Sequence, residues 1–380
     1  MSINFALALA VLNMTSMRAG RVALVLYALH LGASPLTVGL LAATFSAFPA
    51  MLSWAAGRLA DRFGSRWLLV AGALGGGLGI LIPYFVPGLA AIFAAAAMNG
   101  ISLAIYNVSL QNLVGLLSTP ENRTRSFSNY SLSNSVGSLA GPLIAGYSLE
   151  HLGAGGAWFP IALLALVPLV MLIARGRTLP GGTARGRPAG GGIREMIGTG
   201  DMARTLATSS LLQSGQDLFQ FYLPVYGHGA GLSASAIGIV LAMNSAAAFV
   251  VRSALPRLIA KYKEARVLTG AFCVGAAAFA LVPFVANGTV LGLIAFAFGL
   301  GMGCGQPIVT MQMFSKSAAG RSGEALGLRM TVNHLTRLVG PVLFGLIGSA
   351  LGLSAVFWVN GLMLGSGGAL SRPRESKSDT

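Results

Sequence analysis

Charged residues are scarce in this sequence. Only 9% of its 380 residues are Asp, Glu, Lys or Arg, whereas a soluble domain carries roughly 25%. Apolar runs recur from one end of the chain to the other, and many reach the length of about 20 residues that a bilayer core requires. This composition excludes a soluble enzyme, a DNA-binding domain and a secreted disulfide scaffold. It predicts a polytopic membrane protein.

Groups suited to covalent or metal chemistry are equally few. The two cysteines, Cys273 and Cys304, lie inside apolar runs, which is typical of small core residues rather than of a disulfide or a metal site. The sequence contains no HExxH, CxxC or Walker pattern. We therefore expect no enzyme activity, no cofactor and no metal, and the missing nucleotide motif argues against ATP-driven pumping by this chain alone.

Twelve apolar segments are long enough to span a membrane, so we predict an all-α polytopic protein. Their ranges are 4–31, 36–57, 67–86, 89–117, 125–150, 155–174, 203–228, 234–256, 267–285, 288–314, 324–350 and 353–371. The first segment lacks a basic leader region, which favours a span over a cleavable signal peptide. The connections are short except at 175–200, where arginines lie among Gly, Pro and Thr without periodicity, as in a flexible linker.

Basic residues are confined to alternate connections. The turns near 32–35, 86–89, 150–156, 228–233, 286–289 and 350–354 contain no Lys or Arg, whereas the opposite connections and the linker carry many. An excess of Lys and Arg marks cytoplasmic loops. We therefore expect both termini and the linker to be cytoplasmic, and this topology explains the net charge of +15 without a nucleic-acid partner.

The two halves of the sequence repeat each other. A shift of 199 residues, without a gap, places Asn134 on Asn333 and Gly141-Pro142 on Gly340-Pro341. This repeat predicts two pseudo-symmetric six-helix halves, 1–174 and 201–380, joined by a cytoplasmic linker at 175–200. Repeated halves with a binding site near the membrane midplane are the design of secondary transporters.

A ten-residue motif closes the second predicted span. Its sequence is Gly57-Arg58-Leu59-Ala60-Asp61-Arg62-Phe63-Gly64-Ser65-Arg66. It resembles the signature loop of the major facilitator superfamily, G-x-L-a-D-R-x-G-R/K-R/K, and departs from it only at Ser65, where a basic residue is usual. A degenerate copy without the acid follows the eighth span, at Pro256–Tyr262. The span number, the linker and the repeat extend the resemblance over the whole chain.

The resemblance implies a gate that holds one conformation closed and releases it on switching. Asp61 provides a carboxylate suited to face a helix N-terminus, and Arg123 and Arg125 are its candidate partners. The alternative is a basic turn that only sets topology. The gating residues implied by the motif are Gly57, Asp61, Arg62, Gly64 and Arg66.

Span five carries a second motif, Gly137-Ser-Leu-Ala-Gly141-Pro142-Leu-Ile-Ala145-Gly146. It is similar to the G-x-x-x-G-P-x-x-G-G pattern of the family's antiporters, with Ala145 in place of one glycine, and this resemblance implies export. The alternative is close packing of small residues between helices. Span four departs from many drug antiporters, because Ala96 stands where an arginine usually precedes the pair Asn99-Gly100.

Several charged residues lie inside predicted spans, where charge is expensive and marks a functional site by default. Arg18 and Arg21 are three residues apart in span one and therefore share a helix face. Asp217 is the only acid deep in any span. It belongs to a polar stripe of span seven at i, i+3, i+4 and i+7, formed by Gln213, Gln216, Asp217 and Gln220.

Two interpretations of these charges compete. In the structural one, Asp217 pairs with Arg18, Arg21 or Arg337 and neutralises a buried charge. In the functional one, the arginines bind an anionic group of the substrate, and Asp217 pairs them in the empty site or carries a proton. Arg252 and Arg329 lie nearer to span ends and are predicted to reach the membrane surface.

Spans four and ten add uncharged polar groups at helical spacing, suited to orienting a ligand. They are Tyr106, Asn107 and Gln111 in span four, and Gln306 and Thr310 in span ten. The last two are the mirror positions of Asn107 and Gln111. The alternative is ordinary hydrogen bonding between spans.

Together these features predict a monomeric secondary transporter of a bacterial-type inner membrane, similar to major facilitator transporters. Proton-coupled export of a small organic compound by alternating access is favoured. One alternative is transport of an organic anion bound by Arg18 and Arg21, and another is a non-transporting membrane sensor or scaffold. The expected partners are the substrate, protons and lipid.

Overall fold

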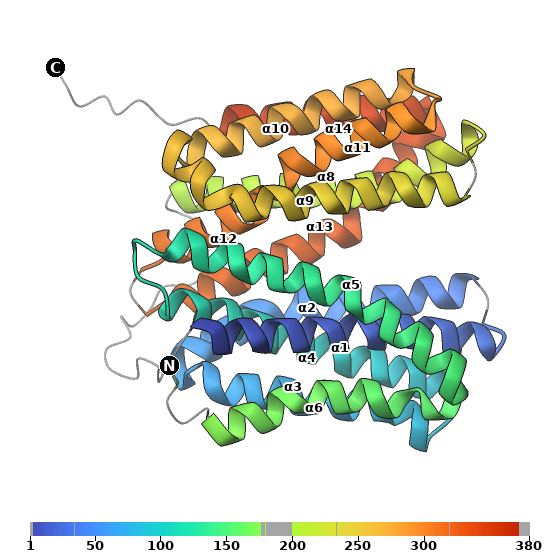
Figure 1. Ribbon diagram of the computed structural model, residues 1–380, viewed down its shortest axis with the longest axis vertical. Helices are drawn as coiled ribbons and strands as arrows, with labels where there is room; N and C mark the ends of the chain where they lie inside the picture. The colour runs from blue at the N-terminus through green and yellow to red at the C-terminus, as the bar shows by residue number, and fades with distance from the viewer. Residues whose placement is uncertain are drawn as a thin grey trace. The chain divides into compact units, whose positions relative to one another are not determined.

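The computed structural model describes residues 3–33, 35–175, 179, 200–232, 234–318 and 320–371. Every regular element in these ranges is a helix (Figure 1). The predicted linker at 175–200 lies outside the described residues, except for Arg175, Leu179 and Gly200.

Each predicted span corresponds to a helix or a helix pair. The first six are α1 (Ile3–His30), α2 (Pro35–Phe63), α3 (Ser65–Phe85), α4 (Leu89–Leu116), α5 (Arg123–Gly156) and α6 (Trp158–Arg175). The others are α8 (Gly200–Gly229), α9 (Ala234–Tyr262), α10 (Glu264–Leu281) with the 3-10 turn η2 (Val282–Phe284), α11 (Gly288–Gly303), α12 (Gly305–Lys316), α13 (Ser322–Leu351) and α14 (Leu353–Ser371). Within the described ranges, nine helices are long and apolar enough to cross a membrane, with α11 and α12 taken as one.

Helices α2 and α9 continue beyond the predicted span ends at 57 and 256. Polar residues such as Asp61 and Lys261 end the apolar run, but they are compatible with a helix. The sequence therefore predicts the positions of the spans more accurately than it predicts where the helices end.

The predicted span at 288–314 consists of two helices, α11 and α12, which meet at Cys304 and which together are long and apolar enough to cross a membrane. The physical cause of the break is Pro307. Proline has no N–H. The carbonyl of Gly303, four residues earlier, therefore lacks the backbone N–H that it would accept from in an uninterrupted helix. The glycines around the break, including Gly303 and Gly305, also weaken the helix at this point.

Two compact units make up the chain. One contains 1–196 and 313–335, and the other contains 197–312 and 336–380. The first unit therefore includes the end of α12 and the first part of α13, segments that the sequence repeat assigns to the C-terminal half.

In the first unit α1 packs against α5 and α6, α4 packs against α2 and α3, and α3 packs against α6 (Figure 1). The span-five motif lies at the contact between α5 and α1. A Cβ atom at Gly141 would lie 2.5 Å from Cβ of Arg18, and one at Gly137 would lie 2.7 Å from Cβ of Met14. These glycines allow a close approach of the two helices, which is the packing role expected of small residues in membranes.

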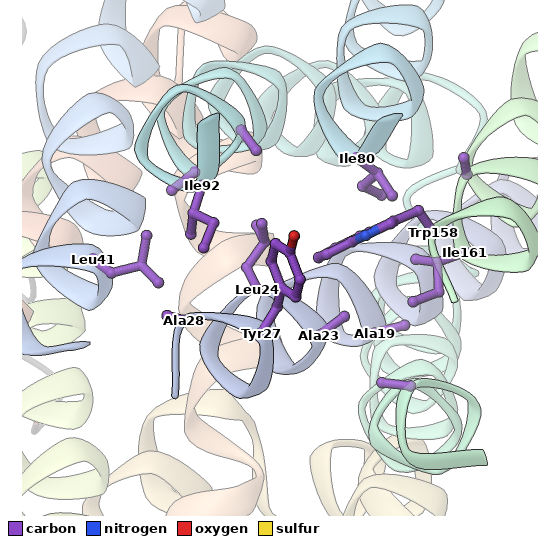
Figure 2. Packing of buried hydrophobic residues seen from close by; sticks show 14 of the residues in the cluster. Ala19, Ala23, Leu24, Tyr27, Ala28, Leu41, Ile80, Ile92, Trp158 and Ile161 are labelled. Atoms are coloured by element: carbon purple, nitrogen blue, oxygen red, sulfur yellow. The ribbon is translucent and has the colours of Figure 1, made fainter. Parts of the chain in front are cut away.

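An apolar core lies between α1, α3, α4 and α6 of this unit (Figure 2). The rings of Tyr27 and Trp158 meet edge to face with centroids 5.4 Å apart, a favoured aromatic geometry. Leu24, Ile80 and Ile92 are fully buried beside them. The core fixes α1, the helix that carries Arg18 and Arg21.

In the second unit α11 packs against α9 and α10, and α14 packs against α10 and α8. Glycines again permit the close contacts, since a Cβ at Gly299 would overlap the backbone oxygen of Asn244 and one at Gly303 would lie 2.7 Å from Cα of Ala248. The rings of Phe219 on α8 and Phe298 on α11 stack with centroids 3.9 Å apart. This packing positions α8, which carries the polar stripe.

Candidate gate and transport site

Asp61, in the last turn of α2, lies at the N-terminus of α13 within the first unit. Its Oδ1 accepts a hydrogen bond from the Gly323 N–H at 2.8 Å, and its Oδ2 accepts one from the Glu324 N–H at 2.8 Å. Asn112 Nδ2 donates to Oδ1 at 3.4 Å. The first N–H groups of a helix have no intrahelical partner and carry the positive end of its dipole, so they stabilise a carboxylate.

A set of charged and polar side chains surrounds this contact. Glu324 is buried, and Arg321 Nε lies 2.8 Å from its Oε2. Arg58 Nε lies 3.8 Å from Glu324 Oε1, while its guanidinium lies 4.9 Å from the ring centroid of Trp54. Ser322 Oγ donates to Asn112 Oδ1 at 2.6 Å. The contact therefore connects α2, α4 and α13 through both charge and hydrogen bonds.

Two positions of the motif require glycine, each for a different structural reason. A Cβ at Gly57 would overlap the carbonyl group of Gly323, so α2 can approach α13 only without a side chain there. Gly64 has φ 81°, a left-handed conformation that side chains disfavour. Gly57 is thus required for the close approach of the two helices, and Gly64 is required for the backbone conformation beside the contact.

Burial raises the pKa of Asp61 from its ordinary value to about 6, and the Glu324 charge also raises it. The hydrogen bonds from the Glu324 and Gly323 N–H groups and from Asn112 lower it in part. Asp61 lies beyond the predicted span 36–57, at the predicted cytoplasmic side. Its carboxylate is therefore placed to titrate slightly below neutral pH.

The expected arginine partners of Asp61 were wrong in this conformation. Arg123 Nη1 donates instead to Ser315 Oγ at 3.2 Å, and its guanidinium lies 5.2 Å from the ring centroid of Phe314. Arg125 is exposed. Backbone N–H groups take the place of the arginines because the N-terminus of α13 fills the space in front of the carboxylate.

The other two basic residues of the motif lie against neighbouring aromatic rings. The guanidinium groups of Arg62 and Arg66 each lie 5.0 Å from a ring centroid, that of Phe63 and that of Trp67 respectively. Phe63 and Trp67 are themselves exposed. These contacts are cation–π interactions at an exposed site, worth roughly 0.5–1 kcal/mol each.

The polar residues of α4 join a second network in the same unit. Gln111 Oε1 accepts from Arg329 Nη2 at 2.8 Å, and Asn107 Oδ1 accepts from the Tyr130 hydroxyl at 3.3 Å. The prediction that Arg329 reaches the membrane surface is wrong, since the residue is only 4% exposed. Tyr106 is fully buried, and its Cβ borders Gly72 of α3.

Arg18 and Arg21 both lie on α1. The Cβ of Arg18 borders Gly141 of α5, whereas the guanidinium of Arg21 lies 5.7 Å from the ring centroid of Phe45 on α2. Their spacing places them on one side of α1.

An ion pair forms the centre of the second unit's polar cluster. Arg337 Nε lies 3.1 Å from Asp217 Oδ2, and Arg337 Nη2 lies 3.2 Å from Oδ1. Gln213 Nε2 also donates to Oδ2, at 2.8 Å, and Gln306 Nε2 donates to Gln213 Oε1 at 3.3 Å. The side chain of Arg337 is 37% exposed and that of Asp217 is 19% exposed. Of the three candidate pairings in the sequence, the structure contains the one with Arg337.

Two side chains, Gln216 of the polar stripe and Arg252 of α9, donate to carbonyls near the boundary between α11 and α12. Gln216 Nε2 donates to the Met302 carbonyl at 3.0 Å. Arg252 Nε donates to the Gly303 carbonyl at 2.9 Å, so the prediction that Arg252 extends to the membrane surface is wrong. Gln220 is exposed. A broken span needs such partners, because a carbonyl without one is costly inside a membrane.

Asn112 and the binding partners of Arg252 were missed by sequence reasoning. A single Asn in an apolar helix carries no signal of its own, and its relation to Asp61 arises only from the packing of α2 on α4. The break at Pro307 does carry a signal, namely a proline after a run of glycines. Arg252, which donates to the Gly303 carbonyl, lies on another helix and carries none.

These features define a class of protein: a helical membrane protein with charged networks inside its spans, as in secondary transporters. Among the described residues, no group of three or more His, Cys, Asp or Glu is placed to hold a metal ion.

Comparison with known proteins identifies the family. The family model of the Major Facilitator Superfamily matches residues 6–341, so the chain belongs to this superfamily and is a transporter rather than an enzyme. The uncharacterized MFS-type transporter YuxJ of Bacillus subtilis (strain 168) is 23% identical over 325 residues, which cover 83% of this chain and 82% of the relative. Multidrug resistance protein 2 of the same organism is 24% identical over 334 residues, covering 84% and 81%.

Solved structures support the twelve-helix fold of this superfamily. The crystal structure of the human organic anion transporter MFSD10 (TETRAN) matches with a TM-score of 0.81 and 16% identity, and the match covers 98% of this chain and 100% of the other. At this identity the likeness concerns the fold alone. The protein is thus an integral membrane transporter of the major facilitator type.

Proposed function

We propose that the protein exports a small organic compound in exchange for protons, by alternating access, with Asp217 as the coupling acid. The ion pair between Asp217 and Arg337 carries this proposal. Uptake of a proton by Asp217 removes the negative charge that holds Arg337, and the two side chains belong to different helices, α8 and α13. Protonation therefore changes a contact between helices, which is the link that proton coupling requires.

Two observations favour export. One relative that covers most of the chain is named for multidrug resistance, and the span-five motif resembles the pattern of the family's antiporters. The substrate that fits this proposal is a drug-like cation or neutral amphiphile, for which Gln306 and the other polar groups provide orientation.

The organic-anion alternative relies on Arg18 and Arg21 acting together. In the structure the guanidinium of Arg21 lies over the ring of Phe45. The alternative predicts that anions stabilise the protein and that Arg18→Gln removes this effect.

The test compares ligands and then the Asp217→Asn variant. The purified protein is heated with tetraphenylphosphonium, a lipophilic cation, or with benzoate, an organic anion. A ligand of the folded state raises the unfolding temperature by mass action. Stabilisation by tetraphenylphosphonium supports the proposal, and stabilisation by benzoate that Arg18→Gln abolishes supports the alternative.

Coupling is measured in liposomes that contain only this protein. We expect Asp217→Asn to lose transport of tetraphenylphosphonium driven by a pH gradient, while exchange of labelled for unlabelled compound continues. Full proton-driven transport by Asp217→Asn would disprove the coupling role. Any specific flux in these liposomes also excludes a scaffold that does not transport.

We further propose that the contact of Asp61 with α13 is the gate on the predicted cytoplasmic side. The Asp61 carboxylate caps the α13 N-terminus, and Gly57 permits the close approach. Opening of this side requires α13 to leave the carboxylate, and the cost of that separation sets how often the gate opens.

A further inference from the structure

The turn between α2 and α3 carries a basic and aromatic surface at the predicted cytoplasmic end of these helices. The guanidinium groups of Arg62 and Arg66 lie over the rings of Phe63 and Trp67 respectively. These two rings are 55% and 62% exposed. Trp67 is also the first residue of the predicted span 67–86, so the turn lies at the level of the lipid headgroups, where aromatic rings of membrane proteins gather.

The same turn contains the N-terminus of α3. Its N-cap residue is Gly64, which makes no side-chain hydrogen bond to the helix, and the first turn of α3 contains no acidic residue. The first N–H groups of a helix have no intrahelical partner and carry the positive end of its dipole. Together with the two guanidinium groups, they form a site of positive potential that suits a phosphate group.

Two buried polar atoms at this helix end also indicate a ligand. Ser65 is 1% exposed, and its hydroxyl has no hydrogen-bond partner in the described part of the chain. The same is true of Nε of Arg66. Because the Cα–Cβ bonds of a helix tilt toward its N-terminus, the side chain of Ser65, the first residue of α3, projects from this end. A buried donor without an acceptor is costly, and a phosphate oxygen can accept from each of these two.

The corresponding turn in the second unit contains an anion of its own. The repeat places Ser65 on Glu264, the first residue of α10, and Glu264 Oε2 accepts from Gln312 Nε2 at 3.1 Å. The basic and aromatic pair is present in this turn as well, since Lys261 Nζ lies 5.1 Å from the ring centroid of Tyr262. The second half thus has a carboxylate at the position where the first half has an unpartnered hydroxyl.

We propose that the α3 N-terminus, with Ser65, Arg62 and Arg66, binds the phosphate of an anionic phospholipid headgroup. The backbone N–H groups and the Ser65 hydroxyl donate to the phosphate oxygens, and the guanidinium groups neutralise their charge. Phe63 and Trp67 lie beside the lipid at headgroup level. A lipid is the source of phosphate that suits this place, because anionic lipids give the cytoplasmic leaflet its negative surface potential. The site does not depend on the proposed transport cycle.

Native mass spectrometry of the purified protein in detergent counts the lipids that it binds. The protein is titrated separately with phosphatidylglycerol, which is anionic, and with phosphatidylcholine, whose headgroup has a phosphate but no net charge. We expect one phosphatidylglycerol to bind roughly tenfold or more tightly than phosphatidylcholine. We expect Arg62→Gln to weaken this binding by roughly tenfold, as the loss of one hydrogen bond between charged groups implies.

Ser65→Asp provides the α3 N-terminus with a carboxylate, as Glu264 does for α10. We expect it to abolish the preference for phosphatidylglycerol, because the carboxylate repels the phosphate and takes its donors. An acid at a helix N-terminus is stabilising, so thermal unfolding is expected to show that this variant is folded. Ser65→Asn has the same size without the charge, and its amide can donate, so we expect it to retain the preference.

Lys261→Gln is the matched control, because it makes the same change of charge at the mirror position of Arg62, beside Glu264. We expect it to leave the preference unchanged. Equal binding of the two lipids, or equal losses in Arg62→Gln and Lys261→Gln, would overturn the inference. Displacement of phosphatidylglycerol by an equal concentration of inorganic phosphate would also overturn it, since the site would then bind free phosphate rather than a lipid.

Discussion

At the scale of single residues, Lys263 adopts a backbone conformation that favours glycine. Its φ is 63° and its ψ is 154°, and Gly64, its mirror position in the repeat, has φ 81° and ψ 155°. A non-glycine residue in such a region costs roughly 1–3 kcal/mol. The same turn is thus present in both halves, but in the second half a lysine occupies the position whose backbone conformation favours glycine.

We therefore expect Lys263→Gly to stabilise the protein by about 1 kcal/mol, because the relief of strain exceeds the entropy that glycine loses on folding. Denaturant unfolding in detergent measures the change. Gly64→Ala provides the reverse substitution at the mirror position and is expected to destabilise by a similar amount. A less stable Lys263→Gly protein would show that Lys263 makes contacts worth more than the strain.

The sequence specified the residues of the candidate site only in part. The motif identified Asp61, and the cost of intramembrane charge singled out Asp217 and Arg337. The choice among three arginine partners for Asp217 depended on how helices rotate and pack, which periodicity does not define. Arg329 was misplaced for the same reason, since distance from a span end does not tell which side of a helix is buried.

At the scale of helices, the order and position of the spans followed from apolar length, and the break in span ten did not. Pro307 and the preceding glycines indicate a weak point in the helix, but the prediction relied on the apolar run, which has the normal length of a span. The residues of the predicted polar stripe lie on α8. That Gln213 donates to Asp217 while Gln216 donates to the Met302 carbonyl emerged only from packing.

A buried contact between α4 and α13 gives a test at this scale. Gln111 accepts from buried Arg329 at 2.8 Å. Gln111→Leu removes the acceptor from a buried cation and is expected to loosen the first part of α13, whereas Gln111→Glu adds the opposite charge and is expected to tighten it. The loss of a hydrogen bond to a charged group corresponds to roughly tenfold or more in the opening equilibrium.

Hydrogen exchange of residues 322–335, followed by mass spectrometry, measures both effects. We expect exchange to be faster in Gln111→Leu and slower in Gln111→Glu than in the original protein. Thr310→Val is the control, since Thr310 is the mirror position of Gln111 and its hydroxyl bonds to Gln306 O within its own helix. Equal changes in the two Gln111 variants would contradict a charge-dependent contact.

At the scale of the whole molecule, the sequence repeat and the compact units divide the chain differently. The repeat predicts halves on either side of the linker, whereas 313–335 belongs with the N-terminal helices in the structure. The contacts of Asp61 and Gln111 with α13 give the physical reason. The sequence repeat reflects common ancestry and topology, whereas the compact units reflect the contacts that are made in one conformation.

The pH dependence of the Asp61 contact connects the proposed gate to the conformational equilibrium of the transporter. The pKa of Asp61 is about 6 when α13 covers it, and we expect it to return toward its ordinary value of about 4 when α13 leaves and water reaches the carboxylate. Because the covered form binds a proton more tightly, acidification favours the covered form. The gain accumulates as the pH falls from about 6 to about 4, it amounts to roughly a hundredfold in the equilibrium, and it disappears as the pH rises above 6.

Hydrogen exchange of 322–335 at several pH values, corrected for the intrinsic pH dependence of exchange, measures this equilibrium. We expect protection to increase on acidification and to level off above about pH 6. Asp61→Asn has no proton to gain, so its corrected protection is expected to be flat over this range. Protection that falls on acidification would mean that the α13 N-terminus stabilises the ionised carboxylate by more free energy than its burial costs. The proposed gate would then open rather than close in acid.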